Sequence, residues 1–340
     1  MPKPRVLYVC TEAHTERVFP PETYAALQER YDLTENLTGE GYSTAQVEEL
    51  IPGHEALITG WGAPALNEAV LKAAPELRII AHSAGSVKHL VTREIIDRYL
   101  LPRGIPIYSA NWAIALNVAE STVGLLIMTP RRWAGLNERY HATGQWGYHR
   151  IEVNGQFLQG SVVGIVSAST VAREVIRLLQ PWDVRLLCYD PYLSEADAAA
   201  LGVEKVELDE LFRRSDHVTV HAPKIPETDR MIGAEQLRLL RAGATLVNTS
   251  RGSVIDEAAL IAEARAGRIE VALDVTEPEP PAPDSPLQEL ENVVVLPHVT
   301  GAGQYGYHRI GDGTLQALDD FFAGRPVRGA VDYARWEQLA

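Results

Sequence analysis

The chain has 340 residues, enough for two domains of ordinary size, and its 46% hydrophobic and 22% charged residues are typical of a folded globular protein. The net charge of −14 argues against nucleic acid or an anionic membrane as a partner. Cys10 and Cys188 lie in apolar runs and predict buried thiols in a reducing cytoplasm. The N-terminus enters a strand without a signal-peptide pattern, and the apolar stretch 113–129 contains Asn117 and Glu120, so we expect no membrane span there.

Strands and helices alternate along the first hundred residues. Apolar runs predict strands at Val6–Cys10, Ala56–Thr59 and Leu77–Ser83, and helical spacing predicts helices at Glu22–Arg30 and Pro64–Ala73. This alternation indicates a parallel sheet covered on both faces. We expect the first unit to end near Gly104 and a strand at Ile105–Tyr108 to open the next one.

A long helical stretch, Ala113–Ala142, is interrupted at Pro130 and leads into the aromatic segment Gln145–Tyr148. An arm rich in Trp, Tyr and Arg is typical of a surface that packs on another subunit. An ordinary surface loop explains the same composition equally well.

Residues 161–191 have the layout of a dinucleotide-binding βαβ unit. A strand at Val162–Val166, a tight turn, a helix and a second strand lead to Asp190, which lies 190 − 167 = 23 residues past the turn. The fingerprint's three glycines are replaced by Ser167, Ser169 and Ala172. The Cβ of Ser169 should weaken or reposition the pyrophosphate, while the amides of Thr170 and Val171 stay available to it. The charge of Asp190 predicts NAD(H) rather than NADP(H).

The alternation continues to the end of the chain. Strands are predicted at Val203–Val206, His217–His221, Ala244–Asn248, Ile269–Asp274 and Val293–Leu296, with helices at Gly233–Leu240, Asp256–Ala266 and Gln304–Ala323. We expect the last helix to rejoin the first unit. The domains are therefore predicted as residues 1–104 plus 303–340, and residues 105–302.

One arginine and one histidine follow strands of the second unit, and ligands of open parallel sheets bind at such strand ends. Arg251 could bind a carboxylate in bidentate fashion, His298 could give a proton to a carbonyl oxygen, and Glu279 could orient its ring. Taken singly, each has a plainer explanation as a surface ion pair or structural group. His217 and His221 share a strand face without a third ligand, so we predict no metal site.

Three segments carry a specific resemblance. They are LLRAGATLVNTSRGSVIDEAALIAEARAGRI (Leu239–Ile269), ALDVTEPEP (Ala272–Pro280) and DSPLQELENVVVLPHVTGA (Asp284–Ala302). In order, spacing and residue type the chain resembles the D-isomer-specific 2-hydroxyacid dehydrogenase family from about Leu77 to Asp332.

The resemblance implies two Rossmann-like or flavodoxin-like α/β domains, with the active site in the cleft between a substrate-binding domain and a dinucleotide-binding domain. It implies an NAD(H)-dependent interconversion of a 2-oxo acid and an (R)-2-hydroxy acid, and a homodimer formed through the arm that ends near Tyr148. The implied catalytic residues are Arg251, Glu279 and His298, and the implied substrate-binding residues are Ala84, Gly85, Ser86 and Arg251. The implied cofactor-binding residues are Ser169, Thr170, Val171, Asp190, Pro223, Thr228, Thr249, Asp274 and Gly301.

Two alternatives stay open within the same fold. One is a phosphite-type dehydrogenase, which keeps the same catalytic residues. The other is a catalytically silent or nicotinamide-sensing binding module, similar to the co-repressors of this family. The substrate's side chain is also open: Trp61, Trp112, Tyr305 and His308 could shape a pocket for a large or aromatic group, or could serve only packing.

Overall fold

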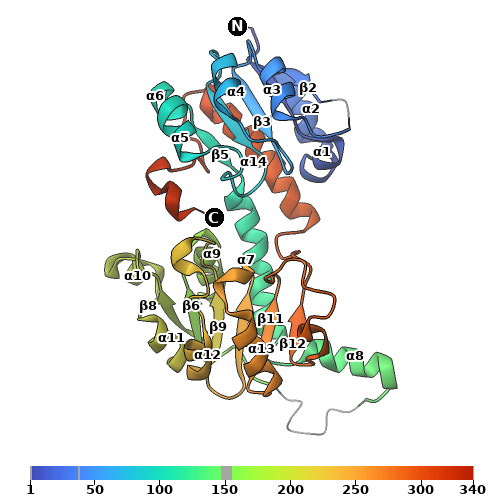
Figure 1. The fold of residues 1–340 in the computed structure, drawn as a ribbon, viewed down its shortest axis with the longest axis vertical. Helices are drawn as coiled ribbons and strands as arrows, with labels where there is room; N and C mark the ends of the chain where they lie inside the picture. Colours follow the sequence, from blue (N-terminus) through green and yellow to red (C-terminus); the bar gives the residue numbers. More distant parts are fainter. Residues whose placement is uncertain (1, 37–38, 147–154, 340) are drawn as a thin grey trace. The chain divides into compact units, whose positions relative to one another are not determined.

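The computed structural model describes residues 2–36, 39–146 and 155–339, which form two compact units (Figure 1). The first unit contains Met1–Ile114 and Ala302–Ala340, and the second contains Ala115–Gly301. The boundary predicted between Gly104 and Ile105 falls too early, because the strand that follows it pairs with the first sheet and not the second.

The first unit is built on a five-stranded parallel sheet in the order β2-β1-β3-β4-β5. Its strands are β1 (Arg5–Tyr8), β2 (Asp32–Glu35), β3 (Ala56–Thr59), β4 (Ile79–His82) and β5 (Ile107–Ser109). All residues of β3 and β4 are buried, as expected of strands covered on both faces.

Helices cover both faces of this sheet and form two cores. One face packs against α1 (Glu12–Val18), α2 (Pro21–Arg30) and α14 (Gln304–Phe322); the other packs against α3 (Thr44–Leu50), α4 (Glu68–Ala73), the continuous segment α5 (Arg93–Ile95), η1 (Ile96–Leu100) and α6 (Leu101–Arg103), and η6 (Tyr333–Gln338). Helix α4 starts later than predicted, because Asn67 caps it by accepting a bond from Val70 N, and Pro64 stays outside the helix.

The second unit is built on a seven-stranded parallel sheet in the order β12-β11-β10-β9-β6-β7-β8. Its strands are β6 (Val162–Val166), β7 (Arg185–Tyr189), β8 (Glu204–Lys205), β9 (His217–Val220), β10 (Ala244–Asn248), β11 (Ile269–Leu273) and β12 (Val293–Val295). The chain order reverses between β6 and β9, and in sheets of this kind a ligand crevice forms beyond the strand ends at that point.

Two layers of helices cover this second sheet, with one core on each face (Figure 1). One layer contains α7 (Asn111–Met128), α9 (Thr170–Leu179) and α10 (Glu195–Leu201); the other contains α11 (Leu208–Arg214), α12 (Ala234–Leu239) and α13 (Glu257–Arg265). Helix α8 (Trp133–Thr143) follows α7 and buries none of its residues. The remaining turns are η3 (Pro226–Thr228), η4 (Gly252–Val254) and η5 (Pro286–Glu289).

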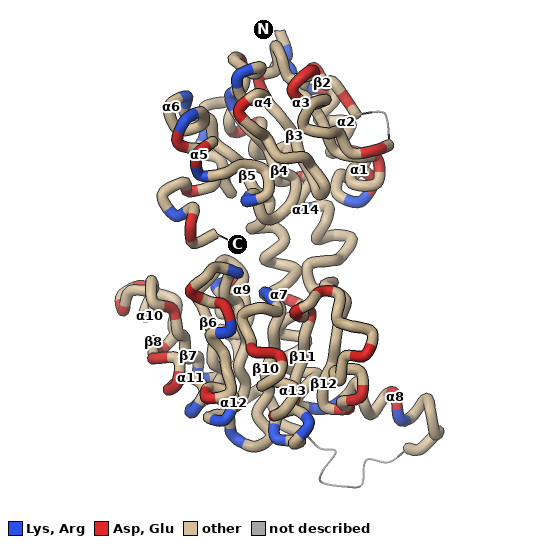
Figure 2. Tube along the Cα trace, viewed as in Figure 1, with Lys and Arg blue, Asp and Glu red and all other residues tan. Residues whose placement is uncertain are grey.

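Helix α7 is the one helix of the described residues that is long and apolar enough to cross a membrane, with a mean hydropathy of 1.3. Three of its polar side chains bond loops of the second unit, as expected of a core helix. Figure 2 shows acidic and basic residues interspersed along both units, so the negative net charge is not gathered in one segment.

Candidate active site

The turn after β6 keeps the shape of a glycine-rich loop without its glycines. Ser167 has a φ of 74°, in the left-handed region that favours glycine and costs a residue with a Cβ about 1–2 kcal/mol. Ser169 caps α9, because its Oγ accepts a hydrogen bond from Ala172 N at 3.4 Å. The first amides of α9, those of Thr170 and Val171, have no acceptor within the helix and suit an anion.

Asp190, directly after β7, contacts this turn. Its Oδ2 accepts hydrogen bonds from Ala168 N at 2.7 Å and from Ser167 Oγ at 3.2 Å. Its Oδ1 accepts one from Tyr192 N at 2.8 Å. The sequence predicted this carboxylate beside the turn, but not that it would bond the turn itself.

The loop after β9 adjoins the turn on the other side of the reversal point. Thr228 Oγ1 donates to Pro223 O at 2.6 Å and accepts from Ile225 N at 3.1 Å, so the two predicted cofactor residues are held in one closed loop. His221, at the start of the loop, is buried, and burial lowers its pKa to about 3. It therefore stays a neutral structural group.

The loop that carries Arg251 is organised by the residue that ends β10. Asn248 accepts bonds from Ser250 N and Ser250 Oγ, and its Nδ2 donates to Arg251 O at 2.9 Å. Gly252 lets this loop pack directly on the next one, because a Cβ there would lie 2.1 Å from the carbonyl carbon and oxygen of Thr276. The Arg251 side chain donates to Ser250 O at 2.7 Å and is half-buried.

Asp274, at the end of β11, holds the histidine loop in place. The residue is 2% exposed; its Oδ1 accepts from Val299 N at 2.7 Å, and its Oδ2 accepts from Thr300 N at 3.1 Å and from the Thr300 hydroxyl. Its carbonyl oxygen accepts from His298 N at 3.0 Å. A direct role of this carboxylate toward a cofactor stays a prediction.

Glu279 and His298 form a hydrogen-bonded pair. His298 Nδ1 lies 2.5 Å from Glu279 Oε1, and the two side chains are 51% and 41% exposed. The ionised carboxylate can only accept, so Nδ1 carries the hydrogen and Nε2 faces away from this bond. Of the two neighbouring glutamates, Glu277 instead pairs with Lys224 at 3.2 Å, while Glu279 contacts the histidine.

Helix α7 contributes a set of contacts that the sequence analysis missed. Asn117 Nδ2 donates to Gly301 O at 3.1 Å, Ser121 Oγ donates to Thr300 O at 3.0 Å, and Thr122 Oγ1 lies 2.9 Å from Thr249 Oγ1. These side chains fix the loops that follow β10 and β12. The sequence feature that could have revealed these contacts is the helical spacing of polar residues in an otherwise apolar helix.

The predicted substrate loop, Ala84–Ser86, lies in the first unit, directly after β4. Ser109 Oγ donates to Gly85 O at 2.6 Å and holds the loop against β5. The preceding residue, Ser83, donates its hydroxyl hydrogen to Thr59 O at 2.7 Å, so it must accept from His14 Nε2 at 2.8 Å. Burial lowers the pKa of His14 to about 4, and this neutral histidine was not identified from the sequence.

The four bulky residues considered for a substrate pocket all make ring contacts within the first unit. Trp112 lies under Arg328, whose guanidinium is 3.7 Å from its ring centroid. Trp61 contacts the His14 ring at 5.1 Å yet keeps 40% of its surface exposed. Tyr305 is 83% exposed and touches His308 edge-on. A role in substrate recognition stays a prediction for these residues.

The described residues contain no group of three or more His, Cys, Asp or Glu side chains that could hold a metal ion. They do fit a dinucleotide. A left-handed turn and a helix start follow the strand at the reversal point, and an acid follows the neighbouring strand. The second unit is thus a dinucleotide-binding unit of the doubly wound class.

Comparison with known proteins agrees with this assignment. Residues 123–300 match the model of the D-isomer specific 2-hydroxyacid dehydrogenase NAD binding domain, which supports a nicotinamide cofactor. A glyoxylate reductase of Korarchaeum cryptofilum is 33% identical over 325 residues, covering 95% of this chain and 94% of its own length. The chain belongs to the D-isomer specific 2-hydroxyacid dehydrogenase family.

Other relatives extend beyond this chain or show the fold alone. A D-3-phosphoglycerate dehydrogenase of Archaeoglobus fulgidus is 31% identical over 86% of this chain, and the chain spans only 54% of that relative's length. Among solved structures, a phosphoglycerate oxidoreductase from Rhizobium etli superposes with a TM-score of 0.81 at 24% identity, over 97% of this chain and 98% of its own. The D-mandelate dehydrogenase of Rhodotorula graminis gives a TM-score of 0.79 at 23% identity, over 97% and 98%.

Proposed function

We propose that the protein is an NAD(H)-dependent oxidoreductase that interconverts a 2-oxo acid and an (R)-2-hydroxy acid. The observation that carries the proposal is the 2.5 Å contact between His298 and Glu279, at the same sheet edge as the dinucleotide turn. An oriented histidine beside a bound nicotinamide is what carbonyl reduction requires, since a proton must reach the oxygen as hydride reaches the carbon.

Each residue has a defined part in this reaction. Glu279 holds the His298 ring through Nδ1, which leaves Nε2 to give a proton to the 2-oxo oxygen during reduction and to take it back during oxidation. Arg251 binds the substrate carboxylate, and the backbone amides of Ala84–Ser86 assist it. A bound nicotinamide supplies the hydride for reduction and accepts it in oxidation.

The cofactor is held through the second unit. Thr170 and Val171 offer amides to the pyrophosphate, and Ser169 shapes the start of that helix. The negative charge of Asp190 opposes a 2′-phosphate and favours NAD(H) over NADP(H). The residues proposed to line the rest of the cofactor are Pro223, Thr228, Thr249, Asp274 and Gly301.

The test is NADH oxidation, read by nicotinamide absorbance, with a panel of 2-oxo acids. We expect turnover with at least one of them, and a loss of about 100-fold or more in kcat for His298→Ala or Glu279→Gln, the usual range for removing an acid–base group or its orienting partner. Glu277→Gln is the matched control, because this neighbouring glutamate pairs with Lys224 and not with the histidine.

Unchanged turnover in His298→Ala would refute the role of this residue. Two further arms of the assay separate the alternatives. Reduction of NAD by phosphite, without reaction of any 2-hydroxy acid, would favour a phosphite-type dehydrogenase. NADH binding without turnover on any substrate would favour a binding module. The left-handed turn at Ser167 supports retained cofactor binding in either case.

We further propose a cytoplasmic homodimer. Both cysteines are free and buried, which suits a reducing compartment. Helix α8 buries no residue within its own chain, and Trp133 and Tyr140 are 49% and 46% exposed on it. Exposed aromatic residues of this kind are typical of subunit interfaces. The arm that was expected to continue to Tyr148 passes outside the described residues after Trp146.

A further inference from the structure

In the dinucleotide turn, the position whose backbone conformation most favours glycine is occupied by a serine. Ser167 has a φ of 74°, and a side chain makes this conformation unfavourable unless the surroundings enforce it. The chain therefore has to supply a restraint that the glycine-containing fingerprint does not need.

The restraint is visible in the hydrogen bonds of Ser167 and its neighbour. Ser167 N donates to Tyr189 O at 2.7 Å, which ties the turn to the end of β7. Ser167 Oγ and Ala168 N both donate to the same oxygen, Asp190 Oδ2, at 3.2 Å and 2.7 Å. Arg173 Nε donates to Ala168 O at 3.0 Å from the helix side. A single carboxylate oxygen thus receives the hydroxyl of the left-handed residue and the backbone amide that follows it.

This use of Asp190 leaves it little capacity for a ligand. A carboxylate has about four lone-pair positions. Ser167 Oγ, Ala168 N and Tyr192 N occupy three of them. About one position remains for a ribose hydroxyl, fewer than a ribose with two adjacent hydroxyls could use.

We propose that Asp190 is a positioning residue that holds the glycine-free turn in its left-handed conformation, and so acts on the whole dinucleotide through the turn. The proposal rests on the cofactor use proposed above. It differs from the discrimination proposed above, in which the charge of Asp190 would only favour NADH over NADPH. The hydrogen bonds that Asp190 accepts then stabilise at Ser167 the conformation that a glycine would adopt without support.

The experiment compares the wild type with Asp190→Ala, Ser167→Gly and the double variant. Asp183→Ala is the matched control, because this exposed aspartate precedes the same strand that Asp190 follows. Dissociation constants for NADH and NADPH are measured by nicotinamide fluorescence, without substrate. Hydrogen exchange of the peptide that covers Ser167–Val171 is measured on the free protein.

We expect Asp190→Ala to weaken NADH by about tenfold, the factor that corresponds to an unsupported left-handed residue, and to speed exchange at Ala168. NADPH should weaken as well but by less, because the variant also removes the charge that opposes the 2′-phosphate. Ser167→Gly added to Asp190→Ala should restore the NADH constant to within about threefold of the wild type, since glycine needs no support there. Asp190→Asn keeps an acceptor oxygen for Ala168 N, so its exchange should stay near that of the wild type while the preference between the two cofactors changes.

The proposal is overturned if Asp190→Ala weakens NADH but strengthens NADPH, and Ser167→Gly restores nothing. It is also overturned if exchange at Ala168 stays unchanged in Asp190→Ala. A wild-type protein that binds neither nicotinamide would contradict the proposed function, while the exchange data would still decide the role of Asp190. If Asp190→Ala does not fold, slow exchange in Asp190→Asn supports the proposal and fast exchange overturns it.

Discussion

Gly252 shows how a single residue decides whether two parts of the candidate site can meet. It follows Arg251 and is the first residue of the turn η4, and a Cβ there would overlap the backbone of Thr276 and approach Glu277 N at 2.7 Å. These are backbone atoms, which cannot turn aside as a side chain could. The segment that leads to Glu279 therefore packs on the Arg251 loop only because residue 252 has no side chain.

We expect Gly252→Ala to lower the melting temperature by several degrees, as overpacking of about 1–3 kcal/mol would, and to reduce NADH-dependent turnover as the two loops separate. The checks are calorimetry and the 2-oxo acid assay. Gly124→Ala in α7 is the control, because a Cβ there meets nothing within 4 Å and alanine favours a helix. Equal stability of the two variants would contradict this reading of the contact.

At this scale the sequence identified residues whose chemistry is local and missed those whose role depends on distant partners. Arg251, Glu279 and His298 stand in strongly patterned segments at strand ends. His14 and Ser83 are 69 residues apart, and nothing in either segment indicates that they hydrogen bond. The second role of Asp190 was hidden for the same reason, since it depends on the backbone conformation of a residue in another loop.

At the scale of elements, apolar strands were predicted well and polar or edge strands poorly. The runs that became β3 and β10 are buried throughout and match their predicted bounds. The edge strand β2, with the sequence DLTE, has no apolar run and was missed. Strand β5 was found but assigned to the wrong sheet, because the partner of a strand is set by how the chain crosses over and not by its own residues.

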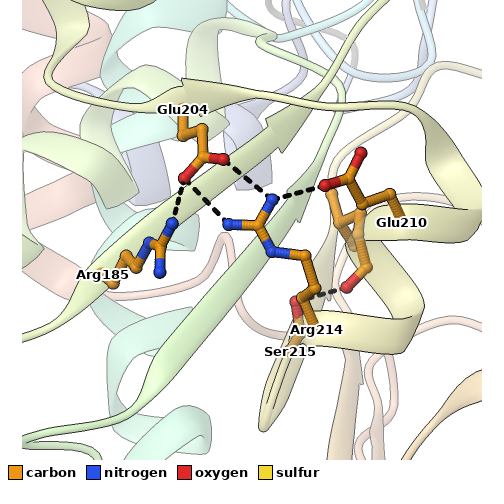
Figure 3. Close-up of polar contacts among 6 residues, drawn as sticks. Arg185, Glu204, Glu210, Arg214 and Ser215 are labelled. Carbon is orange, nitrogen blue, oxygen red and sulfur yellow. Dashed lines mark hydrogen bonds and ion pairs between the residues drawn. The ribbon is translucent and has the colours of Figure 1, made fainter.

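Ion pairs join the short edge strand β8 to β7 and α11. Figure 3 shows Glu204 of this strand between Arg185 of β7 and Arg214 of α11. Its carboxylate oxygens lie 2.6 Å from Arg185 and 2.8 Å from Arg214. Arg214 also contacts Glu210 on its own helix at 2.6 Å. The two arginines lower the pKa of Glu204 to about 2 from its ordinary value of 4.5, with Arg214 the larger cause. All these groups are solvent-accessible, so the stabilisation is modest.

Glu204→Gln should lower the melting temperature of the second unit by about 1–3 °C at pH 7 and low salt, because an exposed pair contributes little. The pKa of Glu204 is lower in the folded state, so its contribution is complete above pH 4.5 and is lost as the pH falls toward 2. Melting curves of the variant and the wild type should therefore converge in acid, and also at high salt. Glu289→Gln, at an exposed site in η5, should show no such convergence.

At the scale of the whole molecule, each of the two sheets positions a different set of the predicted site residues. The seven-stranded sheet reverses its order at β6 and β9 and gathers the dinucleotide turn and the Glu279–His298 pair at one edge. In the five-stranded sheet, the loop Ala84–Ser86 follows β4. The resemblance to the family predicted these two α/β units. It did not predict what packs against α8, because a sequence pattern describes a single chain.

Helix α8 is the part of the molecule whose stability its own chain does not explain. A helix of 11 residues is marginal in water without packing, and none of its residues is buried. Arg131 lies over the rings of Trp133 and Phe157, at 5.3 Å and 4.6 Å, and Tyr140 meets Trp146 edge-on at 5.9 Å. These contacts order an aromatic surface that still remains exposed. A second copy of the chain is the partner that a symmetric assembly offers to such a surface.

We therefore expect the protein to have twice the mass of the chain in light scattering at micromolar concentration. Trp133→Glu combined with Tyr140→Glu should halve that mass, because two charges cannot be buried in an apolar interface without large desolvation costs. The circular dichroism of the sheets should stay unchanged, and Trp182→Glu, at a site 38% exposed beyond α9, should leave the dimer intact. A wild-type monomer would remove α8 as the dimer surface, and the loss of the dimer in Trp182→Glu would place the interface elsewhere on the second unit.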